Sequence, residues 1–461
     1  MKKTLLSLVV ASGLFSNAFA DEISDMKTQI ETLNKKLLSL EKQQKRTNKT
    51  LSEVKQHDAF DNVKFGIDFR NAVDVLEYKD NDTGEIATNP SLLTSRLYLT
   101  MASSPVDKLT FRGKLAIYSI WGAHAYYDDT TQPSLKDWAA SSKATDTLMR
   151  IKEAYFVYSD SIGEQPISFS IGRRPSTNGF LANYRENEKD EGSPSAHTTN
   201  IEVNGAMVKL DWGRYLDGAY TKFVYGRAHT GEINNVYGTG SNPWGPYAQT
   251  GSEDENVDFF VMPGDAYNNG QYELMYQWAH IFNTKGKNTA TSATKVAAGN
   301  ADLLSLGLKI NGIGDEISDF LDATTLFASV ATTTYNPKSG YTLLGSAKSE
   351  TGSSVWVGAV VPDGFTKSGR FGLEYNHGTK YWTPMTWAED TAIGSKVAVR
   401  GDAYEAYWNF DLFGLEYLPS QIRYTYVHHD YTPNINCAGW VAPQAVDITA
   451  SDLRFAITYR Y

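Results

Sequence analysis

From residue 60 onward, apolar and polar residues alternate with a period of two, which is typical of β-strands whose two faces meet different surroundings. The C-terminus shows this most clearly: Leu453, Phe455, Ile457, Tyr459 and Tyr461 share one face. Similar segments predict about sixteen strands, with eighteen possible, near 64–73, 92–101, 109–118, 149–158, 167–173, 201–210, 217–228, 257–262, 271–282, 303–311, 321–331, 354–361, 370–377, 396–410, 420–431 and 452–461.

The connections between these segments are alternately long and short. The long ones span 74–91, 119–148, 174–200, 229–256, 283–302, 332–353, 378–395 and 432–451. Most short ones contain turn-forming residues, such as Pro362-Asp363-Gly364. Outer-membrane β-barrels have short periplasmic turns and long external loops. The order therefore predicts an all-β, antiparallel transmembrane barrel over 60–461, with both strand-bearing ends of the chain on the periplasmic side.

Residues 21–56 follow a different pattern, in which apolar residues recur every three and four positions. They fill heptad positions a and d, with one polar layer at Gln44 and Thr47. This period predicts a periplasmic α-helical coiled coil over 21–58. Because a lone helix would expose the seam, we expect a homo-oligomer, and favour a trimer. A single amphipathic helix lying on another surface is the alternative.

The first twenty residues have the pattern of a signal peptide. Lys2 and Lys3 precede the apolar run from Leu5 to Phe15, and Ala18-Phe19-Ala20 provides small residues at a cleavage site. The apolar run is too short to cross a bilayer. We therefore expect export and cleavage after residue 20; an uncleaved anchor is the alternative.

Composition supports a barrel over a bundle of membrane helices. The chain has a mean hydropathy of −0.39, and no later apolar stretch reaches the ~18 residues that a helical span needs. Barrel strands alternate polar and apolar residues, so a membrane barrel also has a low mean hydropathy. The 28 Tyr and 13% aromatic residues suit membrane interfaces. The net charge of −10 argues against nucleic acid, and Cys437, the only cysteine, excludes an internal disulfide.

Two stretches resemble known families. Residues 150–157, RIKEAYFV, followed by 167–175, ISFSIGRRP, look like neighbouring strands of the general, trimeric porins. In the C-terminal half, 370–378 and 400–407 are similar to a porin-like outer-membrane family of unknown function. The resemblance implies a water-filled channel for passive diffusion of ions and small hydrophilic solutes, in the outer membrane of a Gram-negative bacterium. In general porins the third external loop folds into the barrel.

In this chain the third long loop is 174–200, which makes it the candidate constriction. Its charged residues are Arg174, Arg185, Glu186, Glu188, Asp190 and Glu191. A basic wall is expected where the last strand meets the first, formed by Arg70, Arg96, Arg112, Lys114, Arg150, Lys152, Arg423, Arg454 and Arg460. An acidic loop facing this wall would set a transverse field that governs ion preference. The alternative is a solvated acidic cap outside the barrel.

Other partners and chemistries follow from shorter patterns. An alternating last strand with a terminal aromatic resembles the signal read by the barrel-assembly machinery, here Phe455, Ile457, Tyr459 and Tyr461; a soluble edge strand is the alternative. We expect contact with outer-membrane lipid and possible contact of the stem with peptidoglycan. His428-His429-Asp430 could suggest a metal, but adjacent strand residues face opposite ways. No metal or cofactor is predicted. Aromatic residues in 378–390 could stack on sugars, although packing is the commoner role.

Two rival functions remain beside the channel. An outer-membrane enzyme needs a Ser/His or Asp/His pair on the barrel wall, and no convincing spacing is present, so no catalytic residue is predicted. A structural or surface protein would use the stem to grip the cell wall and the loops to bind an extracellular partner.

Overall fold

The computed structural model describes residues 63–121, 149–176, 179–188, 192–230, 256–314, 317–434 and 439–461. The predicted signal peptide (1–20) and coiled coil (21–58) lie outside these residues, as do Asp190, Glu191 and Cys437. Within the described parts of the chain, no helix combines the length and apolar character that crossing a bilayer requires.

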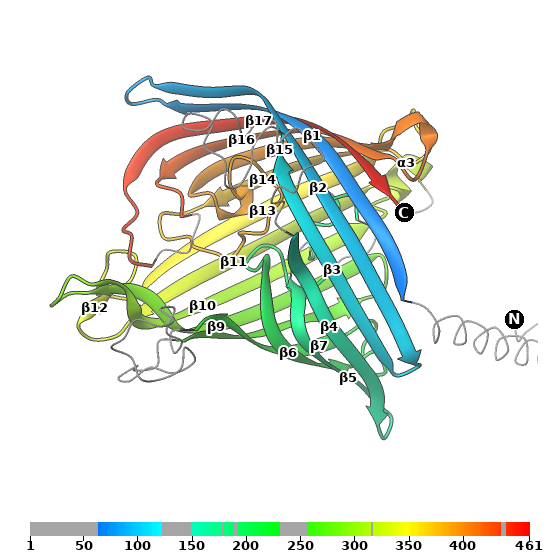
Figure 1. Ribbon diagram of the computed structural model, residues 1–461, viewed down its shortest axis with the longest axis horizontal. Helices are drawn as coiled ribbons and strands as arrows, with labels where there is room; N and C mark the ends of the chain where they lie inside the picture. The colour runs from blue at the N-terminus through cyan, green and yellow to red at the C-terminus, as the bar shows by residue number, and fades with distance from the viewer. Residues whose placement is uncertain are drawn as a thin grey trace, which may run out of the picture. The chain divides into compact units, whose positions relative to one another are not determined.

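Sixteen antiparallel strands form one closed β-barrel, as predicted. Each pairs with its neighbour in the chain, and β17 returns to β1 (Figure 1). The strands are β1 (Lys64–Asp80), β2 (Ile86–Val106), β3 (Leu109–Ile120), β4 (Met149–Ile162), β5 (Gln165–Ser176), β6 (Ile201–Asp211), β7 (Tyr220–His229), β8 (Val257–Asn268), β9 (Tyr272–Asn288), β10 (Thr294–Asn311), β11 (Thr325–Pro337), β13 (Glu350–Pro362), β14 (Arg370–Gly378), β15 (Gly401–Asp411), β16 (Pro419–Tyr431) and β17 (Ala445–Arg460). The two-residue β12 (Tyr341–Thr342) pairs with β9.

Closure depends on a continuous register between the first and last strands. Asp68 lies opposite Arg460, and the pairing continues to Asp80 opposite Ile448. Beyond β17, Tyr461 exchanges two backbone hydrogen bonds with Ile67, of 2.8 and 2.9 Å. We call the end where β1 begins and β17 ends the near end, and the opposite end the far end. Closure leaves no free strand edge among these elements, which removes the main obstacle to placing a sheet in lipid.

The predicted alternation of the two faces is present in the strands. On β10, Leu304, Leu306 and Leu308 are 48%, 49% and 41% exposed on the outside, whereas Ser305 and Lys309 are buried inside. An apolar outer face suits hydrocarbon, because it carries no polar group that water would have to solvate. The inner face collects the residues that position the site described below.

Two of the predicted long loops are wrong. Within 74–91 and 283–302 the strands continue as paired hairpins, so the connections are only 81–85 and 289–293. These extensions are largely polar, and a search for apolar alternation misses strands without an apolar face. The predicted strand starts at 321 and 396 are also wrong, because α3 (Asp319–Asp322) and the 3₁₀ helix η2 (Lys396–Ala398) occupy those positions.

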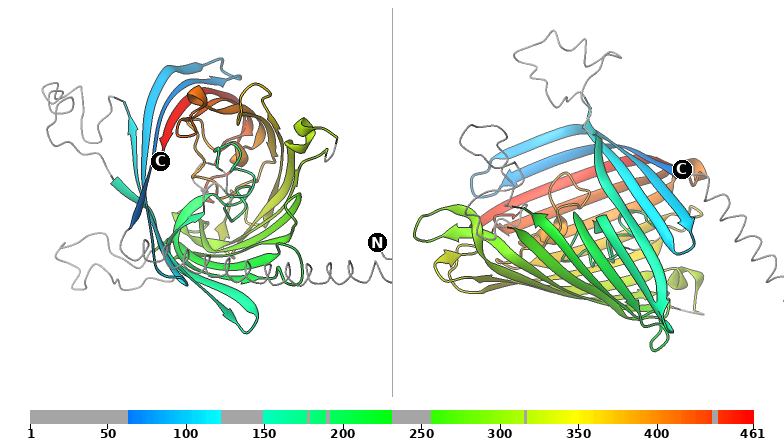
Figure 2. Two further views of the ribbon diagram at one scale, coloured as in Figure 1. Left: turned by 90° about the vertical axis from the view of Figure 1, so that its right-hand side faces the viewer. Right: turned by 60° about the horizontal axis from the view of Figure 1, so that its bottom comes forward.

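Two far-end connections enter the barrel instead of extending from it. Figure 2 (left) shows them inside the ring of strands, residues 179–200 in green-cyan and residues 379–400 in orange. We call them the 179–200 loop and the 379–400 loop. They are joined by backbone hydrogen bonds, from Met385 N to Thr198 O (2.9 Å) and from Ala388 N to Asn200 O (2.9 Å). The lumen therefore contains a partition made of two mutually bonded segments.

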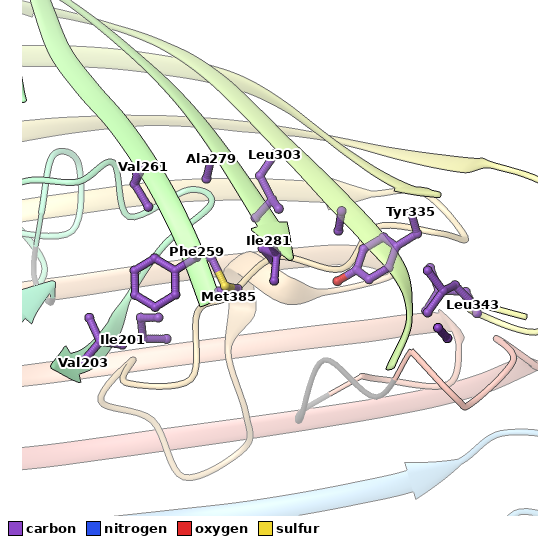
Figure 3. Close-up of a cluster of buried hydrophobic side chains, with 13 residues drawn as sticks. Ile201, Val203, Phe259, Val261, Ala279, Ile281, Leu303, Tyr335, Leu343 and Met385 are labelled. Atoms are coloured by element: carbon purple, nitrogen blue, oxygen red, sulfur yellow. The ribbon is translucent and has the colours of Figure 1, made fainter. Parts of the chain in front are cut away.

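Apolar side chains attach this partition to the wall. Phe180 is fully buried in a cluster with Met275, Phe327 and Trp356, and its ring lies where a Cβ on Gly307 would be. A second cluster, shown in Figure 3, packs Met385 of the 379–400 loop beside Phe259 and other inward residues of β6 to β11. Burial of this kind contributes about 1.5–3 kcal/mol for each large side chain. The interior is thus more apolar than strand alternation alone predicts.

Candidate functional site

Asp390, in the 379–400 loop, lies at the centre of a cluster of four arginines. Its carboxylate forms ion pairs with Arg70, with Arg96 at 3.0 Å and with Arg454 at 3.1 Å. Its backbone carbonyl accepts a hydrogen bond of 2.6 Å from Arg423. We call these four side chains and Asp390 the arginine cluster. It joins the loop to strands β1, β2, β16 and β17 at once.

The barrel register explains why these arginines meet. Arg70 lies directly opposite Arg96, and Arg423 directly opposite Arg454. Like charges opposite each other on a sheet repel, so the arrangement requires nearby anions. Asp390 supplies one, while Asp74 pairs with Arg454 and Asp68 lies 2.9 Å from Arg96. The cluster is therefore a charge-compensated part of the wall whose balance depends on a loop residue.

The arginines also set the charge state of Asp390. Burial by itself would raise the pKa of this carboxyl, but the positive charges of Arg70, Arg454, Arg96 and Arg423 outweigh burial and hold the pKa well below its ordinary value. Asp390 is thus ionised throughout the physiological pH range. Its side chain is 22% exposed, toward a small void that the cluster's arginines also line.

A second charge network fixes the two loops beside the cluster. Lys396 is buried between Glu374 of β14 and Glu405 of β15, at 2.6 Å from the latter. Arg185, 1% exposed in the 179–200 loop, reaches Glu389 at 2.6 Å. Buried ions of this kind are stable only when paired, so each loop residue depends on its partner. The partition is held by charge as well as by apolar packing.

The predicted basic wall divides into separate groups. Four of its members form the arginine cluster, and Arg460 lies 3.1 Å from Asp68. Lys114 pairs with Glu153 at 2.6 Å and Lys152 with Glu202, while Arg112 is exposed and hydrogen-bonded to Tyr155. Arg150 lines a cavity at the far end. The predicted residues therefore lie on the inner face of the barrel, but in separate groups and not as one continuous basic surface.

Of the four acidic residues predicted in the 174–200 loop, the structure describes Glu186 and Glu188. Glu186 pairs with its neighbour Arg185 at 3.0 Å, and Glu188 lines a near-end cavity. Arg174 belongs to β5 and lies over the Tyr155 ring, with 4.9 Å between its guanidinium carbon and the ring centroid. The 379–400 loop contributes two further carboxylates, Asp390 to the arginine cluster and Glu389 to Arg185.

Sequence reasoning missed Asp390 because it treated 378–395 as an external loop. The available signal was the density of large aromatic residues there, including Tyr381, Trp382 and Trp387. An outward loop has little reason to carry so many, and Trp382 is in fact fully buried, with its indole N–H bonded to Val397 O at 2.8 Å. Trp387, by contrast, is 47% exposed at the far-end cavity.

Cavities of very different size lie beside the partition. One of about 530 Å³ lies at the near end, beside Asn183, Lys309 and Arg370. One of about 440 Å³ lies at the far end, against Trp387 and Ala388 of the 379–400 loop. A small one of about 40 Å³ is lined by Asp390 and the arginines around it. The space beside the arginine cluster is therefore much smaller than the cavities at the two ends.

His197, in the 179–200 loop, is a serine-paired histidine that the sequence search did not find. Its Nδ1 lies 2.8 Å from the Ser329 hydroxyl and its Nε2 2.9 Å from the Ser354 hydroxyl. A hydrolytic triad needs a third group to orient the ring, and here serines occupy both nitrogens. The ring and both serines are buried, so the pair fixes the loop instead of presenting a nucleophile.

The docking of the 179–200 loop should weaken in acid. Burial lowers the pKa of His197 to about 3, against an ordinary value of 6.5. Between these two values the released loop takes up a proton on His197 and the docked loop does not. The docking equilibrium constant is therefore largest above pH 6.5 and falls by up to tenfold for each pH unit between 6.5 and about 3. Hydrogen exchange of residues 192–200, corrected for its intrinsic pH dependence, should show this slope. His197→Asn, which cannot titrate, should flatten it; an equal slope in both proteins would contradict the role of His197.

His428 and His429 face different surroundings, as the alternation predicts. His428 is about one third exposed and lies 2.9 Å from Asp447, while His429 is buried. No group of three or more metal-ligating side chains occurs among the residues that the structure describes.

The predicted assembly signal lies on the outer surface of β17. Phe455, Tyr459 and Tyr461 are 38%, 45% and 74% exposed, and Ile457 shares their face. These residues are therefore accessible on the outside of the barrel. Their recognition by the assembly machinery stays a prediction.

Comparisons with solved structures place the chain beside outer-membrane proteins. The anion-selective porin from Comamonas acidovorans is 13% identical with a TM-score of 0.49, over 87% of this chain and 100% of that one. OprB of Pseudomonas putida, in its high-pH structure, is 12% identical with a TM-score of 0.47, over 89% and 96%. The outer membrane channel DcaP of Acinetobacter baumannii is 13% identical with a TM-score of 0.45, over 87% and 97%. At these values we draw no function from the likeness.

A search of curated proteins found no match. The family described as "Protein of unknown function (DUF3373)" matches residues 87–458, which is most of the barrel. The predicted similarity to a porin-like family of unknown function is thereby confirmed. The chain, a porin-like β-barrel with a charged partition in its lumen, belongs to this DUF3373 family.

Proposed function

We propose that the protein is an outer-membrane diffusion channel whose two inner loops and arginine cluster form the selective constriction. The observation that carries this proposal is the convergence of Arg70, Arg96, Arg423 and Arg454 on Asp390 inside a closed barrel. Charged side chains facing a narrow lumen set ion preference in pores. A barrel with only a structural role needs no such concentration of like charges, since apolar side chains of similar volume would stabilise its interior as well or better.

The orientation and assembly belong to the same proposal. The apolar outer face supports insertion in lipid, with the far end outside the cell and the near end in the periplasm. The coiled coil predicted at 21–58 would then lie in the periplasm and join the chains as a trimer. The exposed aromatic residues of β17 would serve as the signal for the assembly machinery.

The charges around the small cavity favour anions. Its lining contains five arginines against two carboxylates, Glu186 and Asp390; the arginines are Arg70, Arg96, Arg185, Arg423 and Arg460. A volume of about 40 Å³ has room for only a few water molecules, at roughly 10–15 Å³ for each. We therefore expect an anion-preferring channel with conductance steps far below those of an unobstructed sixteen-stranded barrel.

Planar-bilayer recording of the detergent-purified full chain tests this function. Discrete conductance steps should appear, and a salt gradient should give a reversal potential on the anion side. Steps with a cation preference would contradict the role of the arginine cluster. If no steps appear while the protein inserts fully, the channel proposal fails, and the apolar packing inside the lumen would then favour the structural or surface role.

A further inference from the structure

The far-end cavity carries a second set of cations, separate from the arginine cluster. Four cations line it, Arg150, Lys152, Arg173 and Arg227, against one carboxylate, Glu202. They come from β4, β5 and β7, so three strands direct positive charge into one space. Within a lumen of low dielectric, such convergence attracts a multivalent or organic anion more strongly than a single surface arginine does.

Two of these guanidinium groups keep hydrogen-bonding capacity for a ligand. Arg173 touches Glu202 through one nitrogen at 3.3 Å, and its side chain is 33% exposed, so part of its guanidinium group stays open to the cavity. Arg150 is exposed and pairs with no carboxylate in the described part of the chain. Each guanidinium offers five N–H donors in a planar fork that fits a carboxylate with two bonds. Lys152 and Arg227, by contrast, are paired with Glu202 and Asp258.

Flat apolar surfaces adjoin these donors. Trp387 is 47% exposed and lines the same cavity from the 379–400 loop. Tyr118 is 49% exposed, with its hydroxyl 3.0 Å from that of Tyr98, so its ring is held in place. Exposed, fixed aromatic rings bind flat ligands by stacking at little entropic cost. A polar inorganic anion would leave these rings unused.

We propose that the far-end cavity binds small aromatic carboxylates, with the carboxylate on Arg150 and Arg173 and the ring against Trp387. The volume of about 440 Å³ is within the range of small-molecule sites and exceeds that needed for a chloride ion. The site rests on the proposed channel function only in that it gives the channel a preferred solute, which binds before reaching the arginine cluster. Because Trp387 lies three residues from Asp390, the occupied cavity and the constriction share one loop.

Titration calorimetry on the detergent-purified full chain tests the site without relying on conductance. The probe is 2-naphthoate, compared with its neutral counterpart 2-naphthamide and with the non-aromatic cyclohexanecarboxylate. Naphthoate should bind at least tenfold more tightly than either. Arg150→Gln and Arg173→Gln should each weaken it about tenfold, as the loss of one charge-assisted hydrogen bond implies. Trp387→Ala should bring naphthoate down to the level of cyclohexanecarboxylate.

The matched control is Arg214→Gln, on a near-end turn far from the cavity, which should change naphthoate binding less than twofold. Equal binding of naphthoate and naphthamide, or variants at Arg150 and Arg173 that bind like the control, would overturn the proposal. Binding of naphthoate to a protein without conductance steps would uphold this site while the channel function fails. Conductance steps without naphthoate binding would support the channel function and overturn this site.

Discussion

Asp390→Asn is expected to raise the anion-to-cation permeability ratio of the channel several-fold and to enlarge its conductance steps. The change keeps the side-chain volume and removes the carboxylate that three guanidinium groups contact. Removing one partner of a buried ion pair costs about 3–5 kcal/mol; with 22% of the Asp390 side chain exposed, the cost here lies toward the lower end. The uncompensated arginines would recruit anions from the lumen, and the 379–400 loop would lose its ion pairs with β1, β2 and β17 while keeping the backbone hydrogen bond from Arg423. The reversal potential in a salt gradient and single-channel amplitude measure the two effects.

Asp82→Asn provides the matched control for this change. Asp82 lies on the exposed connection between β1 and β2, so the same loss of charge occurs away from the partition. It should leave reversal potential and step size unchanged. If Asp390→Asn behaves like Asp82→Asn, the arginine cluster does not control permeation.

Phe180→Ala is expected to free the 179–200 loop and so widen the lumen. The Phe180 ring is fully buried beside Met275, Phe327 and Trp356, and its removal should cost about 3–5 kcal/mol. A loss of 3 kcal/mol lowers the docking equilibrium roughly 100-fold. We expect larger and noisier conductance steps, together with rapid trypsin cleavage after Arg185, which is 1% exposed in the docked loop.

The control for Phe180 is Phe413→Ala, which removes an equally large ring that is 83% exposed on the near-end connection between β15 and β16. It should leave both conductance and cleavage at Arg185 unchanged. Cleavage at Arg185 that is equally slow in all three proteins would show that apolar packing does not hold the loop.

The barrel itself could be predicted from the sequence because its physical requirement is repeated in every strand. Hydrocarbon outside and polar groups inside impose the period of two, and each of the sixteen predicted segments overlaps an observed strand. The hairpin extensions beside Asp80 and Asn288 were missed because strands beyond the lipid no longer need apolar residues on one side. There the turn is set locally, by the Asp80 side chain accepting from the Asp82 and Thr83 backbone N–H groups.

The site was predictable only on its strand side. The positions of Arg70, Arg96, Arg423 and Arg454 follow from alternation plus closure of the barrel, and both can be read from the pattern. Their partner Asp390 could not be found this way, since it lies on irregular backbone whose path depends on contacts up to 320 residues away. A loop that enters the lumen has no period to reveal it. Its burial is decided by the packing of residues such as Phe180 and Trp382 against a wall that exists only after folding.

The place where Asp390 is held has a consequence for biogenesis. Its ligands come from the first two and last two strands, so the arginine cluster does not exist until the opposite ends of the chain have paired. Without β17 the chain would lack Arg454, while Met385 and Lys396 would still attach other parts of the loop to the wall. Complete attachment of Asp390 therefore requires a closed barrel.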